Sequence, residues 1–174
     1  MSSIDELEDA RQDLESLLLD VLNSTLGEEA FTTDESLPAG PLATSRLSIH
    51  DEAQDTYLGI EIRVGAVLAR LLASKMMAAG DPSPDDLLDA VGELGNIVGG
   101  NVKTLLYHTA RLSLPMADLN SRTGPGDPDD PSTTLRVAAS VFGQTAQVVL
   151  TPGAPVDGLY WPPSQEDEAL EKQP

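Results

Sequence analysis

The spacing of apolar side chains changes repeatedly along this chain, and this pattern restricts the possible folds more than any other feature. Helical spacing occurs in three segments, 4–26, 66–79 and 84–106. Alternation of apolar and polar residues occurs in five segments, 47–49, 58–64, 112–116, 135–141 and 146–150. Alternation of this kind is typical of antiparallel strands with one buried face. The pattern predicts an α+β domain, a mostly antiparallel sheet with helices packed on one face.

The size and charge of the chain narrow its class. It has 174 residues, enough for one domain with a real core. Ten Lys and Arg residues against 29 Asp and Glu residues give a formal net charge of −19. Such a charge repels nucleic acid backbones and anionic lipid surfaces, so neither is expected as a partner. The N-terminus is acidic and no apolar run reaches the ~18 residues of a membrane span, so we expect a soluble cytoplasmic protein.

Acidic residues gather at the two ends. Residues 1–30 carry nine acidic residues and one basic residue, and residues 162–174 carry four and one. Solubility and the steering of a basic partner both remain possible reasons. The Pro- and Gly-rich segment 120–133 predicts a mobile loop. We therefore expect one domain over residues 1–161, whose end Trp161 anchors, and an acidic disordered tail over residues 162–174.

The residue types that bind metals are scarce. The chain has no Cys, which excludes disulfides, thiolate nucleophiles and Cys-based zinc sites. Its two His residues, His50 and His108, lack the spacing of a metal-binding helix, and His108 is expected to be structural. Asp85, Asp86 and Asp89 stand at the start of a predicted helix, where they favour the helix dipole. We therefore expect no metal site.

The predicted helix over residues 84–106 contains four interior glycines, Gly92, Gly95, Gly99 and Gly100. Each glycine costs roughly 1 kcal/mol relative to Ala in a helix interior. The first three lie on one flank of the apolar side, which predicts close packing of the helix backbone against the core. Gly100 lies on the polar face, where a bare backbone would let another protein approach closely.

Glu93 and Asn96 are neighbours, one turn apart, on the polar face of the same helix. Solvated side chains at such positions commonly have no role, although Asn is poorly suited to a helix interior. We expect both side chains to project outward without a partner in their own chain.

The segment Asp89-x3-Glu93-x2-Asn96, followed by Ile-Val-Gly-Gly-Asn, resembles the signature helix of the CheC/CheX/FliY family of chemotaxis phosphatases. The CheX branch is the most similar, because GELGNIVGGN continues its pattern and the chain has one such helix. The family pattern places a Pro about 23 positions after the Asn. Pro115 follows Asn96 by 19 positions, so the next strand is expected to be shifted.

The resemblance implies the CheC/CheX fold and dephosphorylation of the phospho-aspartate of a CheY-like response regulator. Glu93 would pair with a Lys of the regulator, and Asn96 would orient the attacking water. Asp89 and Gly100 would contact the partner. The chain would carry no cofactor of its own, because Mg²⁺ would be bound to the regulator.

CheX-type relatives pair, so the resemblance also implies a homodimer. A non-catalytic module of the same fold, which docks a receiver domain or acts as a switch-type scaffold, is the alternative to a phosphatase.

Overall fold

The computed structural model describes residues 3–37, 40–78, 80–107, 109–122, 134–153, 156 and 158–162. Four helices lie within these ranges: α1 (Ile4–Asp9), α2 (Arg11–Leu26), α3 (Ala66–Met76) and α4 (Pro84–Leu106). Seven strands lie there as well: β1 (Phe31–Thr32), β2 (Pro41–Asp51), β3 (Thr56–Gly65), β4 (Arg111–Leu112), β5 (Met116–Arg122), β6 (Leu135–Val141) and β7 (Gln144–Gly153).

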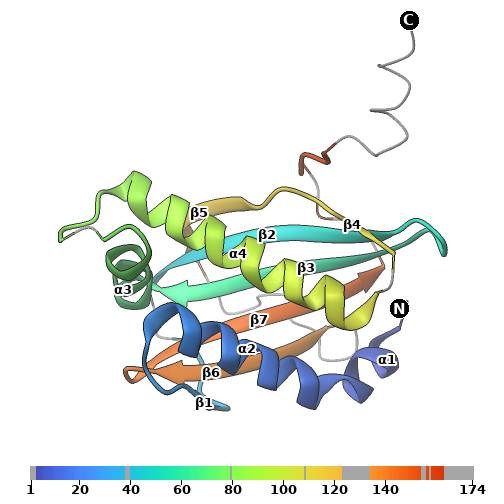
Figure 1. Cartoon of the computed structure of the whole chain (residues 1–174), viewed down its shortest axis with the longest axis horizontal. Coiled ribbons are helices and arrows are strands. Elements are labelled where there is room, and N and C mark those ends of the chain that lie inside the picture. The colour runs from blue at the N-terminus through green and yellow to red at the C-terminus, as the bar shows by residue number, and fades with distance from the viewer. Residues whose placement is uncertain are drawn as a thin grey trace, which may run out of the picture.

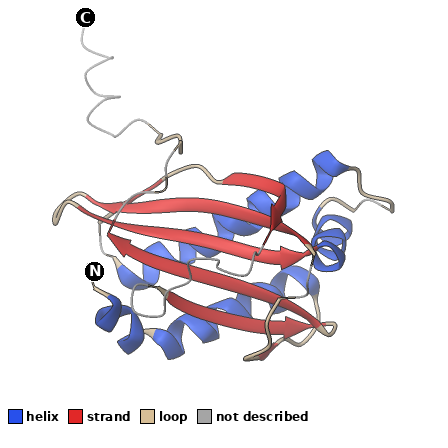
Figure 2. Cartoon of the chain, turned by 180° about the vertical axis from the view of Figure 1, so that it is seen from behind, coloured by secondary structure: helices blue, strands red, loops and turns tan. Residues whose placement is uncertain are grey.

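The strands form one antiparallel sheet in the order β1-β6-β7-β3-β2-β4, and β5 also pairs with β2. The helices lie on one face of this sheet (Figure 1). Seen from behind, the opposite face carries no helix among the described residues (Figure 2). The predicted α+β architecture is therefore confirmed.

The core lies between α2, α3, α4 and the helix-facing side of the sheet. Alternate residues of each long strand point into it, as a one-sided sheet requires. On the sheet these include Leu47, Ile49, Leu58, Ile60, Ile62, Val64, Val148 and Leu150, and on α4 they are Ala90, Val91, Leu94, Val98 and Val102. Burial of these side chains holds α4 over β2, at the side of the sheet where β4 and β5 lie.

The residues at the helix termini explain where the helices begin and end. Ser83 Oγ accepts from the backbone N–H of Asp86 at 3.2 Å, and Asp86 Oδ2 accepts from the backbone N–H of Ser83 at 2.8 Å. This capping box, with Pro84 as the first helical residue, starts α4 where the helix predicted over residues 84–106 begins. Gly27 ends α2 in the left-handed conformation, with φ 71°. The helix predicted over residues 4–26 is divided at Ala10, where the backbone leaves helical geometry.

Several predicted boundaries differ from the structure. The helix predicted over residues 66–79 ends at Met76, and the strand predicted over residues 47–49 extends over Pro41–Asp51. The strand predicted over residues 112–116 is interrupted at residues 113–115, between β4 and β5. The first three residues of the loop predicted over 120–133 belong to β5. Residues 123–133 and 163–174 lie outside the described part, as does His108, so the predictions about them stay predictions. Among the described helices, none combines the length and apolar character that crossing a membrane requires.

Candidate functional site

Helix α4 approaches β2 so closely that two of its glycines leave no room for a side chain. A Cβ built on Gly95 would overlap Ser45 Oγ and lie 3.0 Å from Ser45 Cβ. A Cβ built on Gly99 would overlap the side chain of Leu47, which is fully buried. The predicted close packing is confirmed at both positions, and it fixes the height of α4 above the sheet.

The other two glycines of α4 are not required by packing. A Cβ on Gly92 would have Ala117 Cβ at 3.9 Å as its only close neighbour, an ordinary contact. The prediction that packing requires Gly92 is therefore wrong. A Cβ on Gly100 would have nothing within 4 Å, as expected for its position on the polar side.

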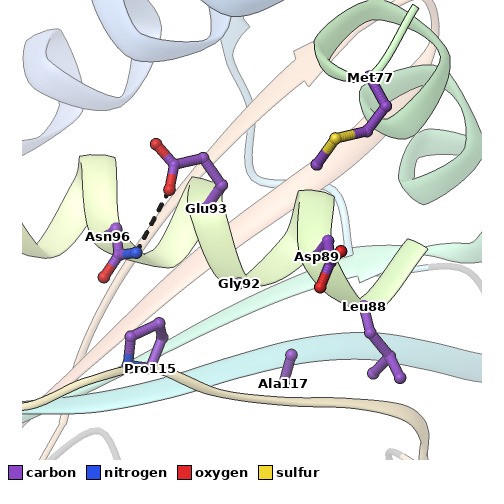
Figure 3. Close-up of a pocket in the computed structure, with 8 residues that line it drawn as sticks. All are labelled: Met77, Leu88, Asp89, Gly92, Glu93, Asn96, Pro115 and Ala117. Carbon is purple, nitrogen blue, oxygen red and sulfur yellow. Dashed lines mark hydrogen bonds between the residues drawn. The ribbon is translucent and has the colours of Figure 1, made fainter. Parts of the chain in front are cut away.

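An open groove of about 570 Å³ runs between α4 and the β5 edge of the sheet (Figure 3). Its lining residues come from three places in the chain: Asp89, Gly92, Glu93, Asn96 and Leu88 from α4, Met77 from the end of α3, and Pro115 and Ala117 from the β5 region. Pro115 lies across the groove from Asn96 in the close-up. The groove thus brings three of the four predicted site residues to one surface, whereas Gly100 lies one turn beyond Asn96 and does not line it.

Glu93 and Asn96 are both exposed and contact each other. Asn96 Nδ2 donates a hydrogen bond to Glu93 Oε2 at 3.3 Å. Within the described part of the chain, neither side chain makes another hydrogen bond. The prediction that neither would have a partner in its own chain is wrong, because they partner each other. The bond is long and solvent-exposed, so an incoming group can replace it at small cost.

The groove carries negative charge. Asp89 and Glu93, one turn apart, are both exposed and both line it. Two carboxylates so placed repel a phosphoryl group unless a cation accompanies it. Asp86, at the start of α4, is engaged elsewhere, because hydrogen bonds from the side chain and backbone of Ser83 hold the pKa of its carboxyl below the usual range. Over the described ranges, no cluster of three or more His, Asp or Glu residues could hold a metal ion.

Five groove residues were not predicted as site residues from the sequence: Met77, Leu88, Gly92, Pro115 and Ala117. Met77 is 39% exposed, which makes it one of the large apolar side chains that reach solvent. Pro115 carries a recognisable signal, since a Pro after the motif helix belongs to the family pattern. Met77 and Ala117 follow no motif, because their place depends on how α3 and β5 pack beside α4.

The comparisons with known proteins agree with this fold and this helix. The family model of the chemotaxis phosphatase CheX matches residues 54–123, a range that contains all of α4. Comparison with curated protein sequences finds no match.

Solved structures share the fold at low sequence identity. The chemotaxis protein CheX from Vibrio vulnificus is 15% identical, with a TM-score of 0.62 over 80% of this chain and 95% of that chain. CheX from Borrelia burgdorferi, in a complex with CheY, BeF3 and Mg²⁺, is 15% identical, with a TM-score of 0.57 over 84% of this chain and 97% of that chain. The FliM middle domain from Vibrio alginolyticus is 13% identical, with a TM-score of 0.54 over 84% of this chain and 92% of that chain. The family match over α4, together with the shared fold, confirms the resemblance predicted from the sequence: residues 54–123 are similar to the CheX family, and the chain shares the fold of CheX proteins.

Proposed function

We propose that this chain is a phosphatase that removes the phosphoryl group from the phospho-aspartate of a CheY-like response regulator. The observation that carries the proposal is the exposed pair Glu93 and Asn96 at an open groove, on the helix that lies within the CheX family match. A protein of similar fold occurs with CheY, BeF3 and Mg²⁺ in the Borrelia burgdorferi complex, which supports a partner of this class.

The chemistry needs little covalent help from this chain. An acyl phosphate is already activated, so catalysis can come from holding a water in line with the carboxylate that leaves. The water oxygen bonds to phosphorus as the bond from phosphorus to the aspartate oxygen breaks. A carboxamide accepts through Oδ1 and donates through Nδ2 without titrating, so Asn96 can orient this water.

Glu93 has two roles in this proposal. In the free chain it accepts the amide of Asn96 at 3.3 Å. When the regulator docks, its active-site Lys takes the carboxylate of Glu93, which releases the amide of Asn96 toward the reacting groups. The cation also offsets the repulsion between this carboxylate and the phosphoryl group. The exchange of the hydrogen-bond partner of Glu93 thus links docking of the regulator to the release of the Asn96 amide.

The remaining site residues would serve docking. Asp89 is exposed on the same helix face and is suited to a basic group of the regulator. Gly100, which has open space around it, would let the partner backbone approach α4 closely. The chain itself would hold no cofactor, and the Mg²⁺ would be bound by the regulator.

The test is the release of phosphate from a phosphorylated receiver domain of the same cell. Asn96→Ala should keep the fold but lower kcat by about 100-fold or more, the usual effect of losing one positioning group. Glu93→Ala should weaken regulator binding more than Asn96→Ala does. Asn101→Ala is the matched control, since Asn101 is an exposed Asn of α4 that bonds its own helix at Ile97 O and does not line the groove. Turnover at the wild-type rate in the Glu93→Ala/Asn96→Ala double variant would refute the proposal.

A non-catalytic docking or scaffold module is the second candidate. The similarity to the FliM middle domain, at a TM-score of 0.54, favours it. The same assay separates the two: a module of this kind binds the phosphorylated receiver domain without accelerating the loss of phosphate.

A further inference from the structure

Beyond β7, the described part of the chain makes contacts with β2 and β4. We name its described residues, Val156 and Gly158–Pro162, the C-terminal strap. The backbone N–H of Val156 donates to Ser48 Oγ of β2 at 2.9 Å. Ser48 lies between the core residues Leu47 and Ile49 in sequence, so its side chain points to the face opposite the helices. In Figure 1 the red end of the described chain lies beside the sheet edge formed by β4 and β5.

The strap is anchored at its end by Trp161. His50 and Tyr57 stack with ring centroids 4.3 Å apart and planes 5° from parallel. Trp161 packs edge-on against both rings, with centroid distances of 6.1 and 6.2 Å. The Arg111 side chain of β4 also donates to the carbonyl oxygen of Pro162. The expectation that Trp161 anchors the end of the domain agrees with these contacts.

Between these anchors, the strap holds Leu114 beside Pro115. We call these two residues, which lie between β4 and β5, the outer wall of the groove. The backbone N–H of Leu114 donates to the carbonyl oxygen of Tyr160 at 2.8 Å. The preceding residue, Ser113, is bound instead to β2, where its N–H donates to the carbonyl oxygen of Ser48 at 2.9 Å. The Leu114 side chain is 48% exposed, so packing contributes little to its position. The carbonyl oxygen of Leu114 accepts from the Oγ of the neighbouring Ser113 at 3.2 Å, a bond within the turn itself. The following residue, Pro115, has no N–H to donate. Among the described contacts, the bond to Tyr160 is therefore the hydrogen bond that ties Leu114 to a distant segment of the chain.

Pro115 faces the proposed catalytic helix. A Cβ built on Gly95 would lie 3.4 Å from Pro115 Cβ, and Pro115 lines the groove opposite Asn96 (Figure 3). The position of Pro115 therefore sets the width of the groove at the end where Asn96 stands. Helix α4 itself is held independently, by Gly95 and Gly99 packed on β2.

We propose that the C-terminal strap positions the outer wall of the groove, with Trp161 as a positioning residue that acts through Tyr160, Leu114 and Pro115. This inference rests on the proposed function for its effect on turnover. Release of the strap lets the wall move while Glu93 and Asn96 stay in place on α4. Docking of the regulator then weakens, whereas the orientation of the water does not change once it has docked.

Three measurements on Trp161→Ala test the proposal. Amide hydrogen exchange of Leu114 becomes about tenfold faster, because local opening of the strap frees its N–H, while Ser113 keeps its wild-type rate. The amide resonance of Gly95 shifts, because its neighbour Pro115 moves. KM for the phosphorylated regulator rises about fivefold with kcat within about twofold, the sign of lost binding in ground and transition states alike.

Matched variants separate positioning from a general loss of structure. Trp161→Phe keeps an edge-on ring and restores all three readouts. Tyr160→Ala leaves them unchanged, because the Tyr160 side chain is 64% exposed and only its carbonyl oxygen is used. Arg111→Met removes the second anchor of the strap, the bond to the carbonyl oxygen of Pro162. Arg111 lies outside the core, so this variant folds and shows the same three changes even if Trp161→Ala does not fold.

Wild-type exchange at Leu114 in the folded variants would overturn the proposal, and so would faster exchange with an unchanged Gly95 resonance. An unchanged KM beside faster exchange would overturn the link to docking. A wrong proposed function gives a different result, because the wild-type chain then does not dephosphorylate the regulator. The Leu114 and Gly95 measurements still show whether the strap holds the outer wall.

Discussion

Asn96 and Asn101 show two behaviours of the same residue type within one helix. Asn101 Nδ2 donates to the carbonyl oxygen of Ile97 at 2.7 Å, the usual way in which a polar side chain engages its own helix. Asn96 donates instead to Glu93 Oε2 at 3.3 Å, and its amide stays off the backbone. An amide bonded to an exposed carboxylate can change partners easily. The neighbouring Glu93 therefore keeps Asn96 available to a ligand.

Tyr107, the residue after α4, should make the fold sensitive to alkali. It is 8% exposed, and burial, followed by the charges of Asp51 and Glu6, raises its pKa to about 12. The unfolded chain loses this proton near the ordinary value of 10. The stability contribution is thus full below pH 10 and falls as the pH rises from 10 through 12. In urea unfolding at pH 8, 10 and 11, Tyr107→Phe should lose less stability with pH than the wild type, and equal slopes would contradict this.

At the scale of the element, α4 has one face packed against β2 and one face exposed to solvent. Gly95 and Gly99 face β2, where any side chain would displace Ser45 or Leu47. Asp89, Glu93 and Asn96 face solvent, and substitutions there leave the core untouched. The helix can therefore carry a functional motif and a tight packing contact along the same 23 residues without conflict.

The four glycines of α4 should divide into two pairs when each is changed to Ala. Gly95→Ala and Gly99→Ala should destabilise the chain by about 1–3 kcal/mol, because a methyl group is forced into filled space. Gly92→Ala and Gly100→Ala should stabilise it by up to about 1 kcal/mol, because the methyl group fits and Ala favours the helix. Chemical unfolding measures both. Gly100→Leu should also fold, yet bind the regulator more weakly than Gly100→Ala does; equal binding would exclude Gly100 from the docking surface.

At the scale of the molecule, the edge of the sheet at β6 bears on the association of two chains. The β6 edge is largely satisfied: Thr33 N–H donates to the carbonyl oxygen of Ala138, and the Arg11 side chain donates to that of Arg136. Satisfied backbone groups of this kind discourage the addition of another strand. Two aromatic side chains near this edge nevertheless reach solvent, Phe31 at 58% and Phe142 at 46% exposure. Both belong to the few large apolar side chains that the described surface exposes. They favour a contact with a second chain through side chains and not through the pairing of strands.

We therefore expect a homodimer in which this aromatic pair contributes to the contact. Light scattering should give twice the 18.4 kDa mass of the chain at high micromolar concentration. The variant Phe31→Ser/Phe142→Ser should shift the mass toward one chain, because it removes apolar surface from the contact. A monomeric wild type would contradict the dimer, and a dimer that survives the double substitution would place the contact elsewhere.

The sequence by itself determined the local features of this protein. The capping box of Ser83 and Asp86, the stop at Gly27 and the exposure of Glu93 beside Asn96 all follow from residue spacing, because the direction of a helical side chain is set by its position along the helix. The alternating segments likewise predicted a sheet with helices on one face. A motif that lies on one helix can be found in this way, because all of its residues share one local geometry.

Only the tertiary structure decided what stands opposite that motif. Pro115 and Met77 reach the groove from separate elements, and Leu114 is tethered by Tyr160, 46 positions further along the chain. Gly92 and Gly95 look alike in the sequence, yet only Gly95 meets Ser45. Contacts of this kind depend on how far one packed element lies from another, which the spacing of residues within either element does not encode.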